Sequence, residues 1–591
     1  MTPIPSKNVR RGDCVKNVKW ILTWIRGSRW KLVASVVLSL LGIVFMTVES
    51  YIFADVVDDI LMPQVFDKLP LYLAAAFGVL LLRLACNYFH NVLAEQAGQT
   101  GVYNLRSALF AKLLKQTPDF YSENRSGDLI NKCSGDVEMV SYFLAYGIPE
   151  WVRAAFMLVF ALLVFLNISW QYTLILFAVT PLSAIVGRRL GAKVHPAFKA
   201  AREQLSQLNT VVQENIAGNR VVKAFVREDY EYQKFQKENE EYKRCNIEAN
   251  MIWLKYGPII DSLATIITVL NLTIGATLVV LGNITLGQLT LFLAMAWTLN
   301  EPMAMLGSLI NDTQRFRASV EKVQELYYTD INLQDPAEVK TPAEARGEIE
   351  FRDVGLSYGP VNVLEHVDLH IQPGETVGIM GPTGSGKTCL INLIDRFIDV
   401  SSGSVLVDGV DVRDYALRDL RGRIALTMQD VFLFSDTVES NIAYGVPNAP
   451  MDVVVEAAKI ADADGFIRAN PEGYDMIVGE RGTGLSGGQK QRISLARALA
   501  KHAPILILDD TTSAVDMETE EYIQEQLRAM PDHATTIIIA QRVSSVMHAD
   551  KILILENGRI SEMGTHAELM RKKGYYYNTC VLQHGLLDDE A

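Results

Sequence analysis

The chain has 591 residues, more than the roughly 150 residues of a typical single domain. It contains 55 Lys and Arg residues against 68 Asp and Glu residues, a net charge of −13, and this balance without an extended basic block excludes a nucleic-acid-binding protein. Apolar residues make up 49% of the chain and concentrate in its first half, which predicts a membrane domain followed by a soluble domain. The six cysteines have neither paired nor metal-ligand spacing, so we expect no disulfide framework and no zinc site.

Six stretches of the first half are nearly free of charge and long enough, or nearly so, to cross a membrane. A helix needs about 20 residues to span the ~30 Å of hydrocarbon in a bilayer. The sequence therefore predicts a six-helix α-helical transmembrane domain over 32–328, preceded by a cytoplasmic N-terminal segment over 1–31. The six windows are 32–53, 71–93, 150–168, 170–187, 258–281 and 284–299.

The loops between these windows alternate in length and charge. The N-terminus and the two long connections are basic, whereas the 54–70 loop is acidic. Enrichment in Lys and Arg indicates that both termini and both long connections are cytoplasmic. Because structureless loops of that length are unusual and these connections are rich in helix formers, we expect long helical hairpins that extend into the cytosol. Their turns are expected at 121–128 and near 214–225.

Several ionisable side chains lie within or near the predicted spans. A charge at membrane depth costs several kcal/mol unless it faces water or a partner, so these residues are candidates for a substrate path. The alternative is a structural ion pair, since Glu150 and Arg153 are three residues apart and can meet on one helix face. The candidates are Glu49, Arg83, His90, Glu150, Arg153, Asp261 and Glu301.

The pattern changes after a linker over 329–346 that is rich in Pro, Ala and charge. Short β-branched strands then alternate with amphipathic helices, which predicts an α/β domain with a C-terminal tail over 347–591. In this domain a buried-strand pattern at 376–380 is followed by the motif GxxxxGKT and a helical segment, the context of a P-loop.

A P-loop binds nucleotide phosphates by its backbone and two side chains. Its glycines let the backbone approach the phosphates, and the helix N-terminus supplies positive potential. Lys387 is expected to reach the β and γ phosphates, and Thr388 to ligate Mg²⁺. The loop comprises Gly381, Pro382, Thr383, Gly384, Ser385, Gly386, Lys387 and Thr388.

Two further motifs follow the P-loop in order. A second apolar strand pattern at 505–508 ends in Asp509, a carboxylate suited to hold Mg²⁺ through water, and Asp510 comes next. Between the two strands lies an LSGGQ sequence followed by a helical segment, formed by Leu485, Ser486, Gly487, Gly488 and Gln489.

With six membrane spans before them, these motifs resemble half-transporters of the ATP-binding cassette (ABC) superfamily, in the type IV, multidrug-exporter-like class. The resemblance covers nearly the whole chain. It implies ATP-driven export of an amphipathic drug, lipid or peptide, with ATP and Mg²⁺ as cofactors. It also implies a dimer, because in this family each ATP lies between the P-loop of one subunit and the LSGGQ signature of the other.

The resemblance implies individual roles as well. Tyr358 stacks on adenine, Gln429 senses Mg²⁺ and the γ-phosphate, and Asp516 belongs to a loop that crosses to the facing subunit. Ser486 and the glycine amides after it bind the γ-phosphate held by that subunit. The hairpin turns become coupling helices, the second of which docks on the partner's ATP-binding domain.

Two residues depart from the family pattern at the catalytic positions. The residue after the magnesium-binding Asp is usually a Glu that orients or deprotonates the attacking water, but here it is Asp510, which is about 1.5 Å shorter. The family's switch His is replaced by Gln541, which can donate a hydrogen bond but cannot carry positive charge.

Both departures affect the same ATP, so we expect a site that binds ATP and hydrolyses it poorly. Since the intact signature serves the opposite site, we expect a heterodimer with a homologous half-transporter that carries the catalytic Glu and His. An ATP-gated channel, a regulatory subunit and a slow homodimeric exporter remain alternatives. We expect a multi-pass protein of the bacterial inner membrane, with its cassette in the cytoplasm and with membrane lipid and a small amphipathic substrate as its other partners.

Overall fold

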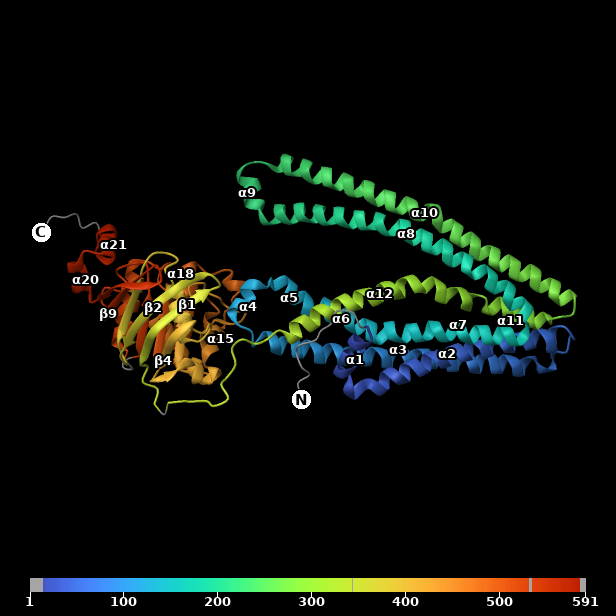
Figure 1. Ribbon diagram of the computed structural model, residues 1–591, viewed down its shortest axis with the longest axis horizontal. Coiled ribbons are helices and arrows are strands. Elements are labelled where there is room, and N and C mark those ends of the chain that lie inside the picture. The colour runs from blue at the N-terminus through green and yellow to red at the C-terminus, as the bar shows by residue number, and fades with distance from the viewer. Residues whose placement is uncertain (1–13, 343, 531–533, 585–591) are drawn as a thin grey trace. The chain divides into compact units, whose positions relative to one another are not determined.

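The computed structural model describes residues 14–342, 344–530 and 534–584; for 14–15, for 175–193 and for some positions between 195 and 304 it describes the backbone alone. The chain divides into two compact units (Figure 1). One holds Met1–Leu114 and Asn124–Thr329, and the other holds Lys115–Glu123 and Asp330–Ala591. The short segment Lys115–Glu123, which contains α4 (Pro118–Glu123), therefore groups with the C-terminal part of the chain.

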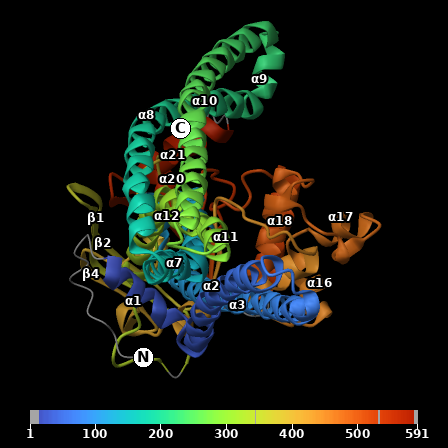
Figure 2. The ribbon, with the colours of Figure 1, turned by 90° about the vertical axis from the view of Figure 1, so that its right-hand side faces the viewer.

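The first unit consists of helices, several of them much longer than a bilayer is thick. In it, α2 packs along α3 and α8 packs along α10 (Figure 2). Helix α12 packs against α6 and α7. At about 1.5 Å per residue, the 48 residues of α8 and the 53 residues of α10 extend well past ~30 Å of hydrocarbon. The helices are α1 (Cys14–Trp24), α2 (Arg29–Val56), α3 (Leu69–Leu113), α5 (Ser126–Cys133), α6 (Gly135–Tyr142), α7 (Ile148–Ile168), α8 (Trp170–Ala217), α9 (Asn219–Ala224), α10 (Glu228–Val280), α11 (Leu286–Met295) and α12 (Trp297–Tyr328).

The two long connections differ in form. The second is a helical hairpin, in which α8 and α10 lie side by side and α9 forms the tip (Figures 1 and 2). The first is broken after its turn, since α5 and α6 meet at Ser134 and a π turn, Phe143–Gly147, precedes α7. Ser134 has non-helical dihedral angles (φ −111°, ψ −84°), so one continuous helix cannot pass through it.

Within the described residues, three helical stretches are long and apolar enough to cross a membrane: Arg26–Leu61, Phe66–Leu113 and Ser126–Ile168. Two shorter apolar helices are Val269–Val280 and Leu286–Met295. Most of the predicted fourth window, 170–187, lies where side chains are not described. The helical transmembrane fold is established, and the count of six spans stays a prediction.

The second unit is built on two sheets. A four-stranded antiparallel sheet has the order β2-β1-β4-β5, with β1 (Ile349–Tyr358), β2 (Val361–Ile371), β4 (Ser402–Val407) and β5 (Val410–Asp411). A six-stranded sheet has the order β10-β9-β3-β8-β7-β6, in which β10 alone pairs antiparallel. Its strands are β3 (Thr376–Met380), β6 (Ile424–Thr427), β7 (Ile505–Asp509), β8 (Thr535–Ile539), β9 (Lys551–Glu556) and β10 (Arg559–Gly564).

The six-stranded sheet has two core clusters, one shared with the four-stranded sheet, α13 and α14 and the other formed with the remaining helices. The parallel strands β3, β8 and β7 are consecutive neighbours, and their residues are almost all buried, as expected for strands with both faces covered. Their carboxyl ends therefore open at one edge, where α/β proteins bind ligands. The helices are α13 (Lys387–Ile394), α14 (Leu417–Gly422), α15 (Val438–Ile442), α16 (Met451–Ile460), α17 (Asp464–Ala469), α18 (Gly487–Leu499), α19 (Met517–Ala529), α20 (His566–Lys572) and α21 (Tyr575–His584).

Candidate nucleotide-binding site

The loop between β3 and α13 has a backbone that requires glycine. Gly381 has φ +144° and Gly386 has φ +101°, conformations that L side chains rarely adopt. A Cβ at Gly381 would also overlap the carbonyl oxygen of Leu555. The P-loop motif thus takes the tight strand-to-helix turn that its glycines indicate, and α13 begins directly after it, which puts a helix N-terminus next to the loop.

Lys387, the first residue of α13, folds back over this loop. Its Nζ donates to the carbonyl oxygens of Gly381 and Pro382, each at 2.8 Å. Burial lowers the pKa of Lys387, while the nearby carboxylates of Asp509 and Asp510 act in the opposite direction. The ammonium group is therefore held between the phosphate-binding loop and two carboxylates.

Asp509 is the last residue of strand β7, and Asp510 follows it. Asp509 is 3% exposed, and its Oδ2 accepts a hydrogen bond from Thr388 Oγ1 at 3.3 Å. Asp510 has a positive φ of +50°, and its N–H donates to the carbonyl oxygen of Ile539 at 2.9 Å. Burial raises the pKa of both carboxyls. The arrangement places a hydroxyl and a carboxylate oxygen together beside the loop, a donor set that suits a hard cation such as Mg²⁺.

These groups surround one cavity of about 230 Å³. Asp510 and Gln541, the two positions that depart from the family pattern, line it together with Lys387, Thr388 and Gln429. The lining residues are Val363, Thr383, Gly384, Ser385, Gly386, Lys387, Thr388, Cys389, Gln429, Asp509, Asp510, Ile539, Ala540 and Gln541.

The LSGGQ signature forms the start of α18 instead. Ser486 is the N-cap, its hydroxyl accepting from the N–H of Gln489, whose side chain accepts from the N–H of Ser486 in return. A Cβ at Gly488 would come within 2.9 Å of the carbonyl oxygen of Ala514. None of Leu485–Gln489 is among the described residues that line the cavity, so the chain's P-loop and signature do not share one pocket.

Two other sequence candidates also lie outside the lining. Tyr358 ends β1 and is 45% exposed; burial raises its pKa, and the carboxylate of Asp119 in α4 adds to that rise. Asp516 is the N-cap of α19, and its Oδ2 accepts from the N–H of Thr519 at 3.2 Å, which holds the pKa of the carboxyl below its usual value.

The candidates of the membrane unit form pairs between helices. Glu49 of α2 lies 3.3 Å from Arg83 of α3. Arg153 of α7 pairs with Glu150 at 2.7 Å and with Glu301 of α12 at 3.2 Å.

The remaining two candidates are His90 and Asp261. The Nδ1 of His90 lies 2.9 Å from the carbonyl oxygen of Ser35. The Asp261 side chain lies outside the described residues.

Sequence reasoning missed three polar residues next to the cavity. Gln491 of α18 is 7% exposed and contacts the segment after Asp510, and Arg542, which follows Gln541, pairs with Glu520, which is 3% exposed. Their neighbours come from distant parts of the chain, so no local spacing signals them; only adjacency to Gln541 and to the LSGGQ motif could have drawn attention to two of the three.

The cassette geometry defines a P-loop nucleotide-binding domain fused to a helical membrane domain. Two family models match the chain: the ABC transporter transmembrane region over residues 32–303 and ABC transporter over residues 364–513. An uncharacterized ABC transporter ATP-binding protein, YknU, from Bacillus subtilis (strain 168) is 38% identical over 92% of this chain and 94% of that protein. An ATP-dependent lipid A-core flippase from Syntrophus aciditrophicus (strain SB) is 35% identical over 90% of this chain and 89% of that protein.

Other relatives point the same way. A putative multidrug export ATP-binding/permease protein, YgaD, from Bacillus subtilis (strain 168) is 34% identical over 85% of this chain and 87% of that protein. The solved structure of a bacterial Atm1-family ABC exporter with ATP bound has a TM-score of 0.78 and 26% identity, covering 95% of this chain and 99% of that one. The chain belongs to the ABC transporters, and it is an ATPase-coupled membrane transporter of the half-transporter exporter type. ABC exporters act as dimers.

Proposed function

We propose that this chain is the subunit of a heterodimeric exporter whose own P-loop site binds ATP with Mg²⁺ but hydrolyses it slowly. The observation that carries the proposal is that Asp510 and Gln541 line the same cavity as Lys387 and Thr388. The residues expected to bind phosphate and Mg²⁺ therefore face the same nucleotide as two catalytic positions whose residues are less suited to hydrolysis.

The binding half of the site fits ATP and Mg²⁺. Thr388 and Asp509 offer adjacent oxygen donors, and Mg²⁺ is usually held by one or two carboxylates together with substrate phosphates. Gln429, on the same cavity, is the third candidate ligand. When bound, the ion supplies charge neutralisation at the phosphates. Lys387 binds the β and γ phosphates, and Tyr358 at the end of β1 stacks on the adenine.

The two catalytic positions are expected to hydrolyse ATP slowly, because Asp510 has a shorter side chain than Glu and Gln541 has no charge. Asp510 is one methylene shorter than the Glu of the family pattern, and a displacement of about 1 Å can cost ~10²-fold in rate. Phosphoryl transfer depends on positioning and on stabilising charge, and Gln541 carries no charge. The N–H of Asp510 donates to the carbonyl oxygen of Ile539, so a backbone shift that would make up for the shorter side chain would break this bond.

The intact signature supports a different second subunit. The LSGGQ segment is a well-formed helix start, with its capping box complete at Ser486 and Gln489. In a homodimer two intact signatures would face two weak catalytic sites. A homologous half-transporter with a catalytic Glu and a switch His would use this signature at an active composite site.

Transport follows from closure of the two cassettes around ATP. We place six membrane spans in the N-terminal unit, with coupling segments at 121–128 and 214–225, the second of which docks on the partner's cassette. The names of relatives, which include lipid A-core flippases and a putative multidrug exporter, support an amphipathic lipid or drug as cargo. The ion pairs Glu49–Arg83 and Glu150–Arg153–Glu301 are candidates for its path. The cassette and both termini are cytoplasmic, and the membrane is the bacterial inner membrane.

The test compares ATP hydrolysis by the full chain before and after repair of both departures. Asp510→Glu combined with Gln541→His is expected to raise hydrolysis at least tenfold while ATP affinity stays within about twofold, because only the catalytic groups change. Wild-type chain that already hydrolyses ATP as fast as the repaired variant would refute the weak site. Uphill, ATP-dependent uptake of a lipophilic dye into inside-out vesicles separates an exporter from an ATP-gated channel.

A further inference from the structure

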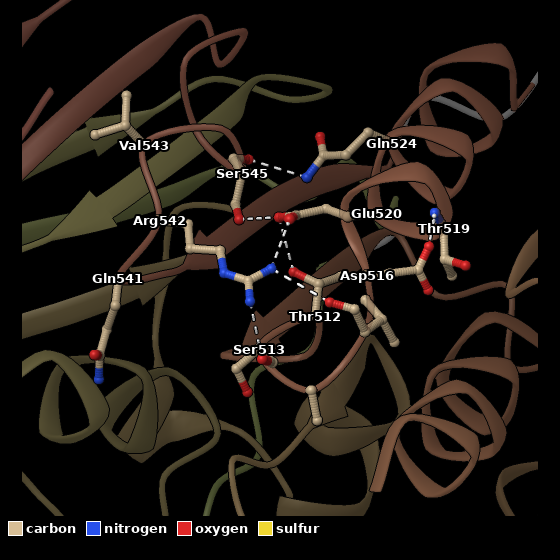
Figure 3. A network of polar contacts seen from close by, with 12 residues as sticks. Thr512, Ser513, Asp516, Thr519, Glu520, Gln524, Gln541, Arg542, Val543 and Ser545 are labelled. Atoms are coloured by element: carbon tan, nitrogen blue, oxygen red, sulfur yellow. Dashed lines mark hydrogen bonds and ion pairs between the residues drawn. The ribbon is translucent and has the colours of Figure 1, made fainter. Parts of the chain in front are cut away.

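An ion pair between the buried carboxylate of Glu520 and the partly exposed guanidinium of Arg542 joins the two loops that follow β7 and β8 (Figure 3). Glu520, in the first turn of α19, is 3% exposed, and its Oε2 lies 3.2 Å from Nη1 of Arg542. The same guanidinium donates to the carbonyl oxygens of Ser513 and Val515, each at 3.3 Å. One side chain of the 540–545 loop thus bonds both a helix and the 510–516 loop.

Glu520 connects both loops as well. Its Oε1 accepts from Thr512 Oγ1 at 3.1 Å and from the hydroxyl of Ser545. One turn further along α19, Gln524 Nε2 donates to the carbonyl oxygen of Ser545 at 3.0 Å. A buried carboxylate is costly unless it is paired and hydrogen-bonded, and here Arg542, Thr512 and Ser545 compensate it.

The 510–516 loop is held from its other side by the signature helix. Gln491 of α18 donates from Nε2 to Ser513 Oγ at 3.0 Å and to the carbonyl oxygen of Asp510 at 3.3 Å. Its Oε1 accepts from the N–H of Ala514 at 3.0 Å. The loop that carries Asp510 at its start is therefore fixed between α18 and the Glu520–Arg542 pair.

Arg542 is placed to act through this loop and not on the nucleotide. Gln541 lines the nucleotide cavity, whereas Arg542 is not among the described residues that line it. Figure 3 shows the Gln541 side chain directed away from the network while the neighbouring guanidinium reaches into it. Gln541 therefore contacts the nucleotide cavity, whereas its neighbour Arg542 contacts the 510–516 loop.

We propose that Glu520 and Arg542 form a positioning clamp that sets the place of Asp510 relative to Gln541 during ATP turnover and makes no contribution to ATP binding. The clamp rests on the nucleotide site proposed above but not on the identity of the second subunit. Loss of the pair frees the 510–516 and 540–545 loops from each other, while the phosphate-binding loop between β3 and α13 keeps its own contacts.

The test uses the full-length transporter in detergent. The starting protein is either the wild type or the Asp510→Glu, Gln541→His variant, whichever hydrolyses ATP faster. Failure of the repair therefore bears on the weak-site proposal alone. Arg542→Gln and Glu520→Gln are each expected to lower kcat about tenfold with KM for ATP within about twofold, since misplacement affects turnover. The double variant is expected to be no slower than the worse single variant, as for residues that act as one unit. Arg542→Lys, which keeps the charge without the fork, is expected to recover part of kcat.

The matched control is Glu525→Gln, which removes the same charge from an exposed position of the same helix and is expected to leave kcat unchanged. An equal loss of kcat in this control would overturn the clamp. So would a double variant in which the two losses of kcat multiply, or a KM for ATP that rises as kcat falls. Amide hydrogen exchange of 510–516 with ATP bound gives a readout that does not need hydrolysis. Faster exchange in Arg542→Gln, whose partly exposed side chain tolerates replacement, supports the clamp, and unchanged exchange overturns it.

Discussion

Thr388 Oγ1 and Asp509 Oδ2 lie 3.3 Å apart, so the start of α13 and the end of β7 meet at one pair of oxygen atoms. The contact joins two segments separated by more than a hundred residues of sequence, and it is possible because β3 and β7 both flank β8 in the parallel sheet. The same pair of oxygens is the proposed magnesium site. A substitution that removes one of the two oxygen atoms tests this assignment.

Thr388→Val keeps the shape of the side chain and removes its hydroxyl. We expect the affinity for ATP in the presence of Mg²⁺ to fall roughly tenfold, while ATP binding without the metal changes little, because the variant lacks only a cation ligand. Fluorescent ATP binding to the full chain over a Mg²⁺ titration measures both. Thr388→Ser retains the hydroxyl and serves as the control; equal loss in both variants would contradict the assignment.

Gly381→Ala tests whether the loop conformation depends on the missing Cβ. The new Cβ would overlap the carbonyl oxygen of Leu555, so the loop must shift, and we expect ATP affinity to fall at least tenfold. Gly409, with φ +77° and no atom within 4 Å of an added Cβ, provides the control for backbone strain alone. Gly409→Ala is expected to cost about 1 kcal/mol of stability and leave ATP affinity unchanged. A larger loss of ATP affinity in Gly409→Ala than in Gly381→Ala would exclude the steric explanation.

Local patterns account for the part of this structure that the sequence predicts. A buried strand, a glycine loop and a helix start are adjacent in sequence, so the turn around Lys387 can be inferred from the residues alone. The ion pairs Glu49–Arg83 and Arg153–Glu301 join different helices, and their pairing depends on helix rotation, which the composition of each helix leaves undetermined. At the break at Ser134, Gly135 follows directly and lowers the helix propensity, but a single glycine is often tolerated within a helix, so it does not by itself predict a break there.

A buried carboxyl far from the nucleotide gives a prediction about pH. Asp395 is 4% exposed, and burial raises its pKa to about 6, although Arg421 and Lys501 act in the opposite direction. The native state therefore holds a proton that the unfolded chain releases between its own pKa and the native one. Stability is then greatest below the unfolded-state value and falls as pH rises through about 6.

Asp395→Asn removes this dependence because the amide does not ionise. We expect the melting temperature of the wild-type chain to fall relative to that of the variant as the pH rises from the unfolded-state pKa of 3.8 to about 6, and to level off above that. Differential scanning fluorimetry of the full chain across this range measures the difference. Parallel curves for the two proteins would mean that Asp395 does not carry a raised pKa.

The triad in the membrane unit makes a prediction about charge balance. Arg153 lies 2.7 Å from Glu150 and 3.2 Å from Glu301, and Oε2 of Glu301 is buried without a hydrogen-bond partner in the described structure. Arg153→Gln leaves two carboxylates without their cation, and breaking such a pair costs more than replacing all of it. We expect the melting temperature to fall by roughly 5 °C. Adding Glu150→Gln and Glu301→Gln is expected to restore most of the lost melting temperature in the triple variant.

A transport path through the triad would add a second effect: the stable triple variant would lose ATP-dependent dye uptake into inside-out vesicles while its ATP affinity stays unchanged. Full uptake by that variant would make the triad a structural ion pair only.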